Sequence, residues 1–184
     1  MAEFGESSYR RFLRGDKAAL EELVKEFSDS LVRYAYSLVK DPVIAEEVME
    51  DCFAALFMKA PRLQSPEHLR RYLYRIAHNK AMDYLRRRRV HVSLEDVDAV
   101  IGSCDPQVDF ARKERDRILY LCMQRLPQQY REVLVLTYFD GFGTEDICRI
   151  LSLRTKQVYN LSARARIALK ELLEKEGISH EDIF

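Results

Sequence analysis

The chain has 184 residues, of which 47% are hydrophobic and 33% charged, a composition typical of a strongly helical protein built as one large or two small domains. Its 30 Lys and Arg residues balance 30 Asp and Glu residues, which excludes a globally basic nucleic-acid-binding protein. Any attraction to DNA must therefore come from segregated patches of charge. The sequence shows no signal peptide and no apolar run of transmembrane length, so we expect a soluble cytoplasmic protein without membrane insertion.

The chain contains four widely separated cysteines: Cys52, Cys104, Cys122 and Cys148. They form no CxxC pair and have no metal-site spacing with His78 or His91. The cysteines that lie in helical patterns are most simply interpreted as small buried residues. The sequence therefore predicts no bound metal and no cofactor.

The first third of the chain predicts three helices. A short leading helix ends near Gly15, and Asp16 can cap a longer helix whose apolar stripe runs from Ala19 to Leu38. Asp41 and Pro42 then have the residue types that favour the start of the next helix.

The helix that begins at Pro42 separates apolar from acidic residues. Its acidic side carries Glu46, Glu47, Glu50 and Asp51, and the segment from Asp41 to Asp51 contains no Lys or Arg. A solvated acidic surface is one interpretation, and a docking surface for a basic partner is the other.

After a turn that contains two prolines, residues 67–89 predict a long basic helix. Leu69, Leu73 and Ile76 mark its core side, and the residues available elsewhere are Arg71, Tyr72, Tyr74, Arg75, His78, Asn79, Lys80, Asp83 and Arg86. Aromatic residues interleaved with arginines suit single-stranded nucleic acid, where bases stack and phosphates are neutralised. Tyrosines that pack at the core margin and arginines that aid solubility are the alternative.

Helical periodicity is lost from Val90 to Asp109, which predicts a linker. Helices are expected again from Ala111 to Leu126 and from Gln128 to Phe139, with Tyr138 in the second helix facing the core.

The stretch from Thr144 to Lys170 predicts a helix-turn-helix. Thr144 and Thr155 are expected to cap its two helices, with the turn at residues 152–154. The outward positions of the second helix are Lys156, Tyr159, Asn160, Ala163, Arg164, Arg166 and Lys170. Six Lys or Arg and no acid lie between Arg149 and Lys170, which suits a helix that reads DNA, although basic amphipathic helices also occur in domains that never touch DNA.

Three segments in this order resemble the bacterial sigma factors of RNA polymerase. They are DPVIAEEVMEDCFAALF, LRRYLYRIAHNKAMDYLRRRR and LPQQYREVLVLTYFDGFGTEDICRILSLRTKQVYNLSARARIAL. The spacing of these segments leaves no room for the domains that primary sigma factors carry before and between them. In this respect the chain resembles the small extracytoplasmic-function (ECF) class. The resemblance implies an all-α protein with domain 2 at residues 1–90, a linker at 91–111 and domain 4, the helix-turn-helix, at 112–184.

The resemblance also implies three functional surfaces. Docking on the clamp helices of the largest subunit of core RNA polymerase would involve Glu46, Glu47, Glu50, Asp51 and Phe53. Contact with the downstream promoter element and its opened strand would involve Arg71, Tyr72, Arg75, Asn79, Asp83, Arg86 and Arg87. Contact with the upstream promoter element would involve Arg149, Arg154, Lys156, Tyr159, Asn160, Ala163, Arg164 and Arg166, with Asn160 and Arg164 on bases.

The sequence departs from the family pattern at several of these positions. Glu50 and Asp51 replace the usual glutamine–glutamate pair, Tyr72 replaces a tryptophan, and Tyr159 replaces a common Lys or Arg. Leu161 and Ser162 stand where a polar or basic residue and then a leucine are usual, so the recognition helix could be rotated. These changes affect the promoter sequence that is read more than the fold.

The function that the resemblance implies is promoter recognition, DNA melting and transcription initiation by a non-enzymatic subunit that an anti-sigma factor restrains. A dimeric helix-turn-helix regulator would leave the acidic helix and the Tyr/Arg/Asn helix without a role. A sigma-like decoy would be expected to lose basic residues that this chain keeps, such as Arg75 and Arg164. An enzyme is disfavoured because no nucleophile is paired with a base and no glycine loop could hold phosphate.

Overall fold

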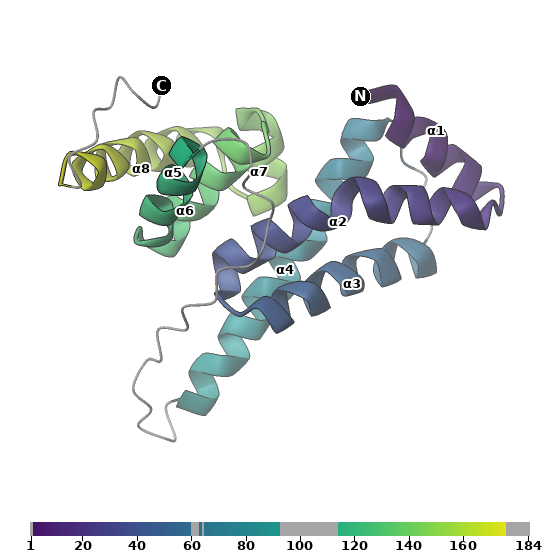
Figure 1. Ribbon diagram of the computed structural model, residues 1–184, viewed down its shortest axis with the longest axis horizontal. Coiled ribbons are helices and arrows are strands. Elements are labelled where there is room, and N and C mark those ends of the chain that lie inside the picture. The colour runs from purple at the N-terminus through teal and green to yellow at the C-terminus, as the bar shows by residue number, and fades with distance from the viewer. Residues whose placement is uncertain (1, 60–62, 64, 93–113, 176–184) are drawn as a thin grey trace. The chain divides into compact units, whose positions relative to one another are not determined.

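The computed structural model describes the chain except for residues 1, 60–62, 64, 93–113 and 176–184 (Figure 1). It divides into two compact units, Met1–Cys104 and Asp105–Phe184. Every regular element among the described residues is a helix, as the all-α prediction requires. None of these helices is both long enough and apolar enough to span a bilayer.

The described residues of unit 1 form four helices, whose ends follow from local chemistry. They are α1 (Ala2–Leu13), α2 (Lys17–Val39), α3 (Pro42–Lys59) and α4 (Pro66–Val92). The Asp16 carboxylate accepts a hydrogen bond from the Ala18 N–H (3.0 Å), which confirms it as the cap of α2. Lys40, with a left-handed backbone (φ 56°), ends α2, and the Asp41 carboxylate accepts from the Val43 N–H (3.0 Å) at the start of α3.

The core of unit 1 forms where α2 packs against α1, α3 and α4. The Tyr34 ring of α2 lies 5.1 Å from the Tyr74 ring of α4, and both side chains are fully buried. The prediction that Tyr74 is among the available residues of this helix is therefore wrong. An aromatic at this position stabilises the packing of α2 on α4 instead of stacking on nucleic acid.

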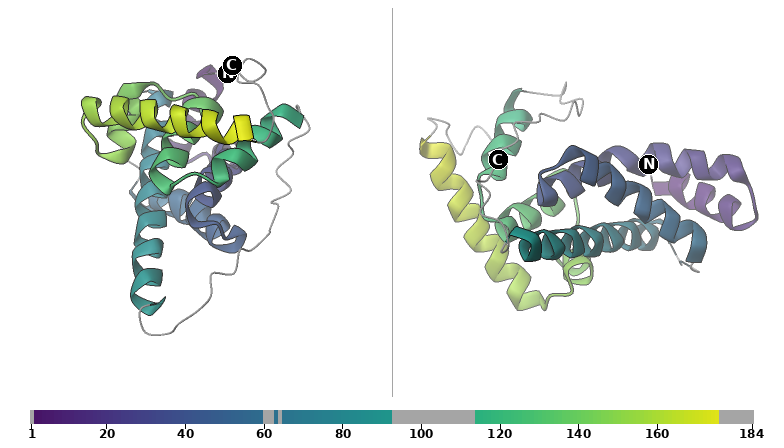
Figure 2. Two further views of the ribbon diagram at one scale, coloured as in Figure 1. Left: turned by 90° about the vertical axis from the view of Figure 1, so that its left-hand side faces the viewer. Right: turned by 90° about the horizontal axis from the view of Figure 1, so that it is seen from below.

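The last turns of α4 project beyond α2 and α3 (Figures 1 and 2). Arg86 and Arg87 lie on these turns and are exposed. Solvent on most sides of this segment reduces the repulsion between neighbouring cations and leaves them available to phosphates.

Unit 2 contains α5 (Glu114–Gln124), α6 (Gln128–Leu134), a π-helical turn η1 (Val135–Phe139), α7 (Thr144–Leu151) and α8 (Thr155–Lys175). The predicted helix from Gln128 to Phe139 is thus α-helical only as far as Leu134. The wider π-helical turn changes which side chains face the core, and Tyr138, which was expected to be buried, is 37% exposed.

The helix-turn-helix begins differently from its prediction. Gly143 in an extended conformation precedes α7 without a side-chain cap, and Thr144 is already the first helical residue. Thr155 is likewise the first residue of α8, where the Gln157 side chain accepts a hydrogen bond from the Arg154 N–H (2.8 Å). The two helices therefore exist as expected, but neither predicted threonine occupies the position before its helix.

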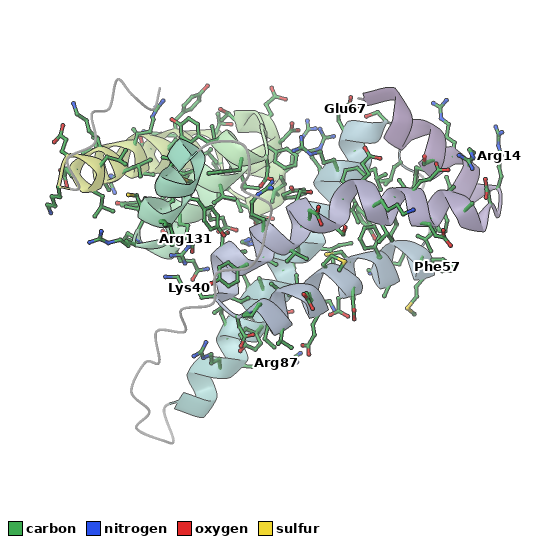
Figure 3. All side chains as sticks on the ribbon, in the orientation of Figure 1. Arg14, Lys40, Phe57, Glu67, Arg87 and Arg131 are labelled. Atoms are coloured by element: carbon green, nitrogen blue, oxygen red, sulfur yellow. The ribbon has the colours of Figure 1, made fainter. Side chains whose placement is uncertain are left out.

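A buried arginine ties α5 to α6 in a way that sequence periodicity did not reveal. The Arg131 guanidinium donates to the carbonyls of Gln124 (3.0 Å) and Leu126 (2.9 Å), at the end of α5 and just beyond it (Figure 3). The last carbonyls of a helix lack N–H donors from a following turn, and Arg131 supplies donors at this end of α5. Burial lowers the pKa of Arg131.

Candidate nucleic-acid and protein interfaces

The acidic side of α3 forms one continuous exposed surface, which we call the acidic face. It consists of Glu46, Glu47, Glu50 and Asp51, all exposed. The other side of α3 is buried at Ala45, Val48, Cys52 and Leu56. The helical spacing that places small and aliphatic residues in the core thus leaves the four carboxylates in solvent.

Phe53, which the family pattern adds to this docking surface, lies in the core and is only 8% exposed. Its ring therefore exposes little surface to a docking partner. Exposed apolar residues of α3 lie at both of its ends: Val43 is 63% exposed near the start, and Phe57 is 53% and Met58 86% exposed near the C-terminal end (Figure 3). The Phe12 ring of α1 lies 5.3 Å from the Phe57 ring.

One residue of the acidic face has a partner on α4. The Lys80 ammonium lies 2.8 Å from the Asp51 carboxylate, in an ion pair that joins α3 to α4. Beside it, the Cys52 thiol donates a long hydrogen bond to the Leu73 carbonyl (3.6 Å). Burial raises the pKa of Cys52 to about 12, so this thiol is a packing residue and not a reactive thiolate.

The polar side of α4 carries the predicted strand-binding residues in a single row. Arg75, Asn79, Asp83 and Arg86 follow one another at spacings of three or four residues, and all are exposed. Arg86 also lies 3.2 Å from the Asp83 carboxylate. Its charge is therefore partly balanced within the helix, whereas no ion pair to Arg87 exists among the described residues.

Arg71 and Tyr72, four and three residues before Arg75, continue this row toward the start of α4 but are half-buried. Burial raises the pKa of Tyr72, and the pKa of Tyr9 on α1 is raised to about 12 by burial and by the nearby Tyr72. Only part of the Tyr72 ring could therefore meet a base. The sequence pattern could not distinguish it from a fully exposed aromatic residue.

In unit 2, α8 presents the predicted duplex-reading residues to solvent. Lys156, Tyr159, Asn160, Ala163, Arg164 and Arg166 are all exposed, with Tyr159 at 60%. Val158, Ala165 and Leu169 are buried on the opposite side, and Leu161 and Ser162 lie half-buried between the two sides. The unusual Leu161–Ser162 pair therefore leaves the polar residues on the outside.

The remaining arginines of the predicted upstream site are also exposed. Arg149 on α7 lies 3.9 Å from Glu145, a distance typical of a weak surface ion pair, and Arg154 stands at the entry to α8. The Arg166 guanidinium donates a hydrogen bond to the Tyr138 hydroxyl of η1. The phosphate-binding candidates thus lie along α7, the turn and α8.

The structure offers no group of three His, Cys, Asp or Glu residues arranged to hold a metal ion within the part of the chain that it describes. The candidate surfaces consist of exposed charge and amide groups on helix faces. This arrangement suits the binding of macromolecules.

Comparisons with known proteins match the two parts of the chain to two regions of one family. Residues 23–90 match the family model for Sigma-70 region 2, and residues 116–169 match that for Sigma-70, region 4. The two matches together cover well over half of the chain. The first includes all of α3 and most of α4, and the second includes the helix-turn-helix.

Individual relatives match this chain over most of both lengths. The chain is 28% identical over 155 residues to RNA polymerase sigma factor SigZ of Bacillus subtilis, covering 84% of this chain and 87% of SigZ. It is 25% identical over 167 residues to ECF RNA polymerase sigma factor SigM of the same species, covering 88% of this chain and 99% of SigM. Sigma factor RpoE of Bartonella quintana, solved in complex with the anti-sigma factor NepR, has a similar fold, with a TM-score of 0.62 at 23% identity over 84% of this chain and 98% of RpoE.

These findings define a sigma factor built from regions 2 and 4. The chain belongs to the ECF class of the sigma-70 family. Its function is therefore that of an RNA polymerase sigma factor in promoter recognition and transcription initiation, and it is not an enzyme.

Proposed function

We propose that each of the three exposed surfaces has a separate role in transcription initiation. Unit 1 binds core RNA polymerase through α3 and the opened promoter strand through α4, and unit 2 binds the upstream duplex through α8. Residues 1–90 would then form the polymerase-binding and melting domain, and residues 112–184 the duplex-binding domain, with 91–111 between them. This proposal rests on the segregation of exposed charge, because carboxylates gather on α3 and cations on α4 and α8.

The acidic face is the docking site for the clamp helices of the largest polymerase subunit. Glu46, Glu47 and Glu50 are exposed on one side of a well-packed helix, so they can meet basic side chains without rearrangement of the core. Complementary charge accelerates encounter and fixes the orientation of docking. Phe57 and Met58 add apolar area at the end of the same helix.

The row on α4 binds the non-template strand of the opened downstream element. Asn79 can hydrogen-bond the edge of an unstacked base, since its amide both donates and accepts. Arg75, Arg86 and Arg87 neutralise phosphates along the row, and Tyr72 offers part of its ring for stacking. Opening the duplex costs a few kcal/mol, which these contacts offset.

The outward side of α8 reads the upstream element in the major groove. Asn160 and Arg164 lie one helical turn apart and contact bases, with Lys156, Tyr159 and Ala163 beside them. Arg149, Arg154 and Arg166 contact phosphates and fix the position of the helix on the duplex.

An anti-sigma factor restrains the protein until its signal arrives. This proposal extends to the chain what is known of RpoE, whose structure includes an anti-sigma factor. Promoter binding places its site of action in the bacterial cytoplasm, where the polymerase and the chromosome are.

Reversing two charges of the acidic face tests the docking site directly. Glu47→Lys with Glu50→Lys should weaken binding to core polymerase about tenfold or more, because like charges would then face each other. Binding of the same full-length variant to duplex DNA should not weaken. Affinities can be measured by fluorescence anisotropy with labelled chain or labelled duplex.

Glu21→Lys with Asp29→Lys is the matched control, since it changes the charge of unit 1 equally at exposed positions of α2. Core affinity should stay near that of the original chain. Equal weakening by the two pairs of substitutions would show that net charge, and not the acidic face, governs docking.

A further inference from the structure

The ion pair between Asp51 and Lys80 joins two surfaces to which different partners are assigned above. Asp51 belongs to the acidic face of α3, and Lys80 follows Asn79 directly on α4. The side chains are about half exposed, at 51% for Asp51 and 46% for Lys80, so both can also be reached from solvent. The inference drawn from this pair rests on the proposed function.

Asp51 differs in this respect from the other acids of its face. None of Glu46, Glu47 and Glu50 forms an ion pair with a residue that the structure describes. Asp51 alone in that set is therefore neutralised in part by its own chain. A cation on a docking partner would compete with Lys80 for Asp51, but no described residue would compete with it for the other three carboxylates.

The position of Lys80 on α4 places it at the border of the strand-binding row. Asn79 and Asp83 are exposed in that row, whereas Ala77 and Ala81 are buried toward the core. Lys80 is exposed between them and bends toward α3, where it meets Asp51. A lysine side chain has a long flexible stem, so the same ammonium can turn toward a phosphate bound beside Asn79.

The helices on either side of the pair are held independently of it. The Cys52 thiol is bonded to the Leu73 carbonyl, and Leu56 and Leu73 are fully buried. Loss of the ion pair should therefore leave α3 and α4 in place. A pair between half-exposed groups contributes little net stability, so another cation can replace Lys80 at small cost.

We propose that Lys80 is a cation shared between the two surfaces. Asp51 holds it in the free protein. When a basic residue of the polymerase binds Asp51, Lys80 is released and neutralises a phosphate of the opened strand. Docking then raises the affinity for single-stranded DNA, and by thermodynamic reciprocity the bound strand raises the affinity for polymerase.

Removing the Asp51 charge should imitate docking in the free full-length protein. Asp51→Asn should bind a short mixed-sequence DNA single strand about two- to fivefold more tightly, the range set by the weakness of a surface pair. The magnitude of the salt slope should rise by about 0.7, since one further phosphate is neutralised. Fluorescence anisotropy at several salt concentrations gives both quantities.

Glu47→Gln is the matched control, because it removes one negative charge from the same helix without releasing a lysine. It should raise strand affinity less than Asp51→Asn and leave the salt slope unchanged. Lys80→Met in the Asp51→Asn background should abolish the gain, and Lys80→Arg in that background should retain it.

Three results would overturn the inference: no gain in affinity for the single strand in Asp51→Asn, an equal gain in Glu47→Gln, or a gain in Asp51→Asn that persists without Lys80. Asp51→Ala is a second variant, and equal thermal melting of all variants excludes a folding effect. The proposed function is judged separately, by the binding of the original chain to core polymerase, so the shared cation can fail while that function stands.

Discussion

At the scale of single residues, the exposed amide of Asn79 is the most specific feature of α4. It lies in the row between Arg75 and Asp83, away from the buried Tyr74. Arginines in that row can bind any phosphate, but an amide can distinguish one base edge from another. We therefore propose that Asn79 recognises the opened strand and that the arginines attract it.

Replacing Asn79 with alanine should impair promoter opening and spare binding to duplex DNA. One lost hydrogen bond to an unstacked base costs on the order of 1 kcal/mol, or roughly a fivefold smaller population of open complex. Permanganate reactivity of unpaired thymines measures that population. Unchanged reactivity would remove Asn79 from the strand-binding site.

Arg164 on α8 is expected to read a base, because it is exposed one helical turn after Asn160. Arg164→Ala should weaken binding to a specific upstream element by about 1–3 kcal/mol, the value of a bidentate base contact. Binding to a random duplex of equal length should weaken much less. Equal losses on both duplexes would show that Arg164 contacts phosphate instead.

At the scale of helices, α1 is attached to α2 by a polar network that sequence periodicity did not predict. The Ser8 hydroxyl donates to Glu22 (2.6 Å), and the Arg11 guanidinium lies within 2.9 Å of Glu22 and 2.7 Å of Asp16. The hydrogen bond from Ser8, followed by that from Arg11, lowers the pKa of Glu22. Arg11 also lowers the pKa of Asp16.

Attachment of α1 should therefore depend on pH. Because both carboxyl groups have lower pKa values in the folded protein, they stabilise the attachment of α1 fully above their unfolded pKa values, which lie near pH 4. This stabilisation is lost as the pH falls through their folded pKa values. Hydrogen exchange of the α1 peptide, corrected for its intrinsic pH dependence, should show falling protection below about pH 4. In Arg11→Met the protection should already be low at neutral pH and should change little on acidification.

Helix positions followed from apolar periodicity and turn residues, but some details within the helices did not. Asp16 and Asp41 cap helices as predicted, because an aspartate at a helix start acts through its own neighbours. The π-helical turn at Val135–Phe139 and the buried Arg131 depend on contacts between helices, which one-dimensional spacing does not contain. For the same reason, the sequence did not distinguish Tyr74, one ring of a buried aromatic pair, from an exposed tyrosine.

At the scale of the whole molecule, the three candidate surfaces could be predicted because helical spacing determines which residues share a side. The acidic face, the row on α4 and the outward side of α8 are exposed as sets. The Asp51–Lys80 pair could not be predicted, since it depends on how α3 packs against α4 in unit 1. Roles of individual residues in these surfaces stay predictions.

The central claim is that this chain directs core RNA polymerase to promoters through these surfaces. Run-off transcription of a pooled genomic promoter library by purified core polymerase, with and without the chain, tests it most directly. We predict discrete new start sites that share an upstream and a downstream element and that disappear with the Glu47→Lys/Glu50→Lys variant. An identical set of transcripts with and without the original chain, despite confirmed binding to core polymerase, would contradict the claim.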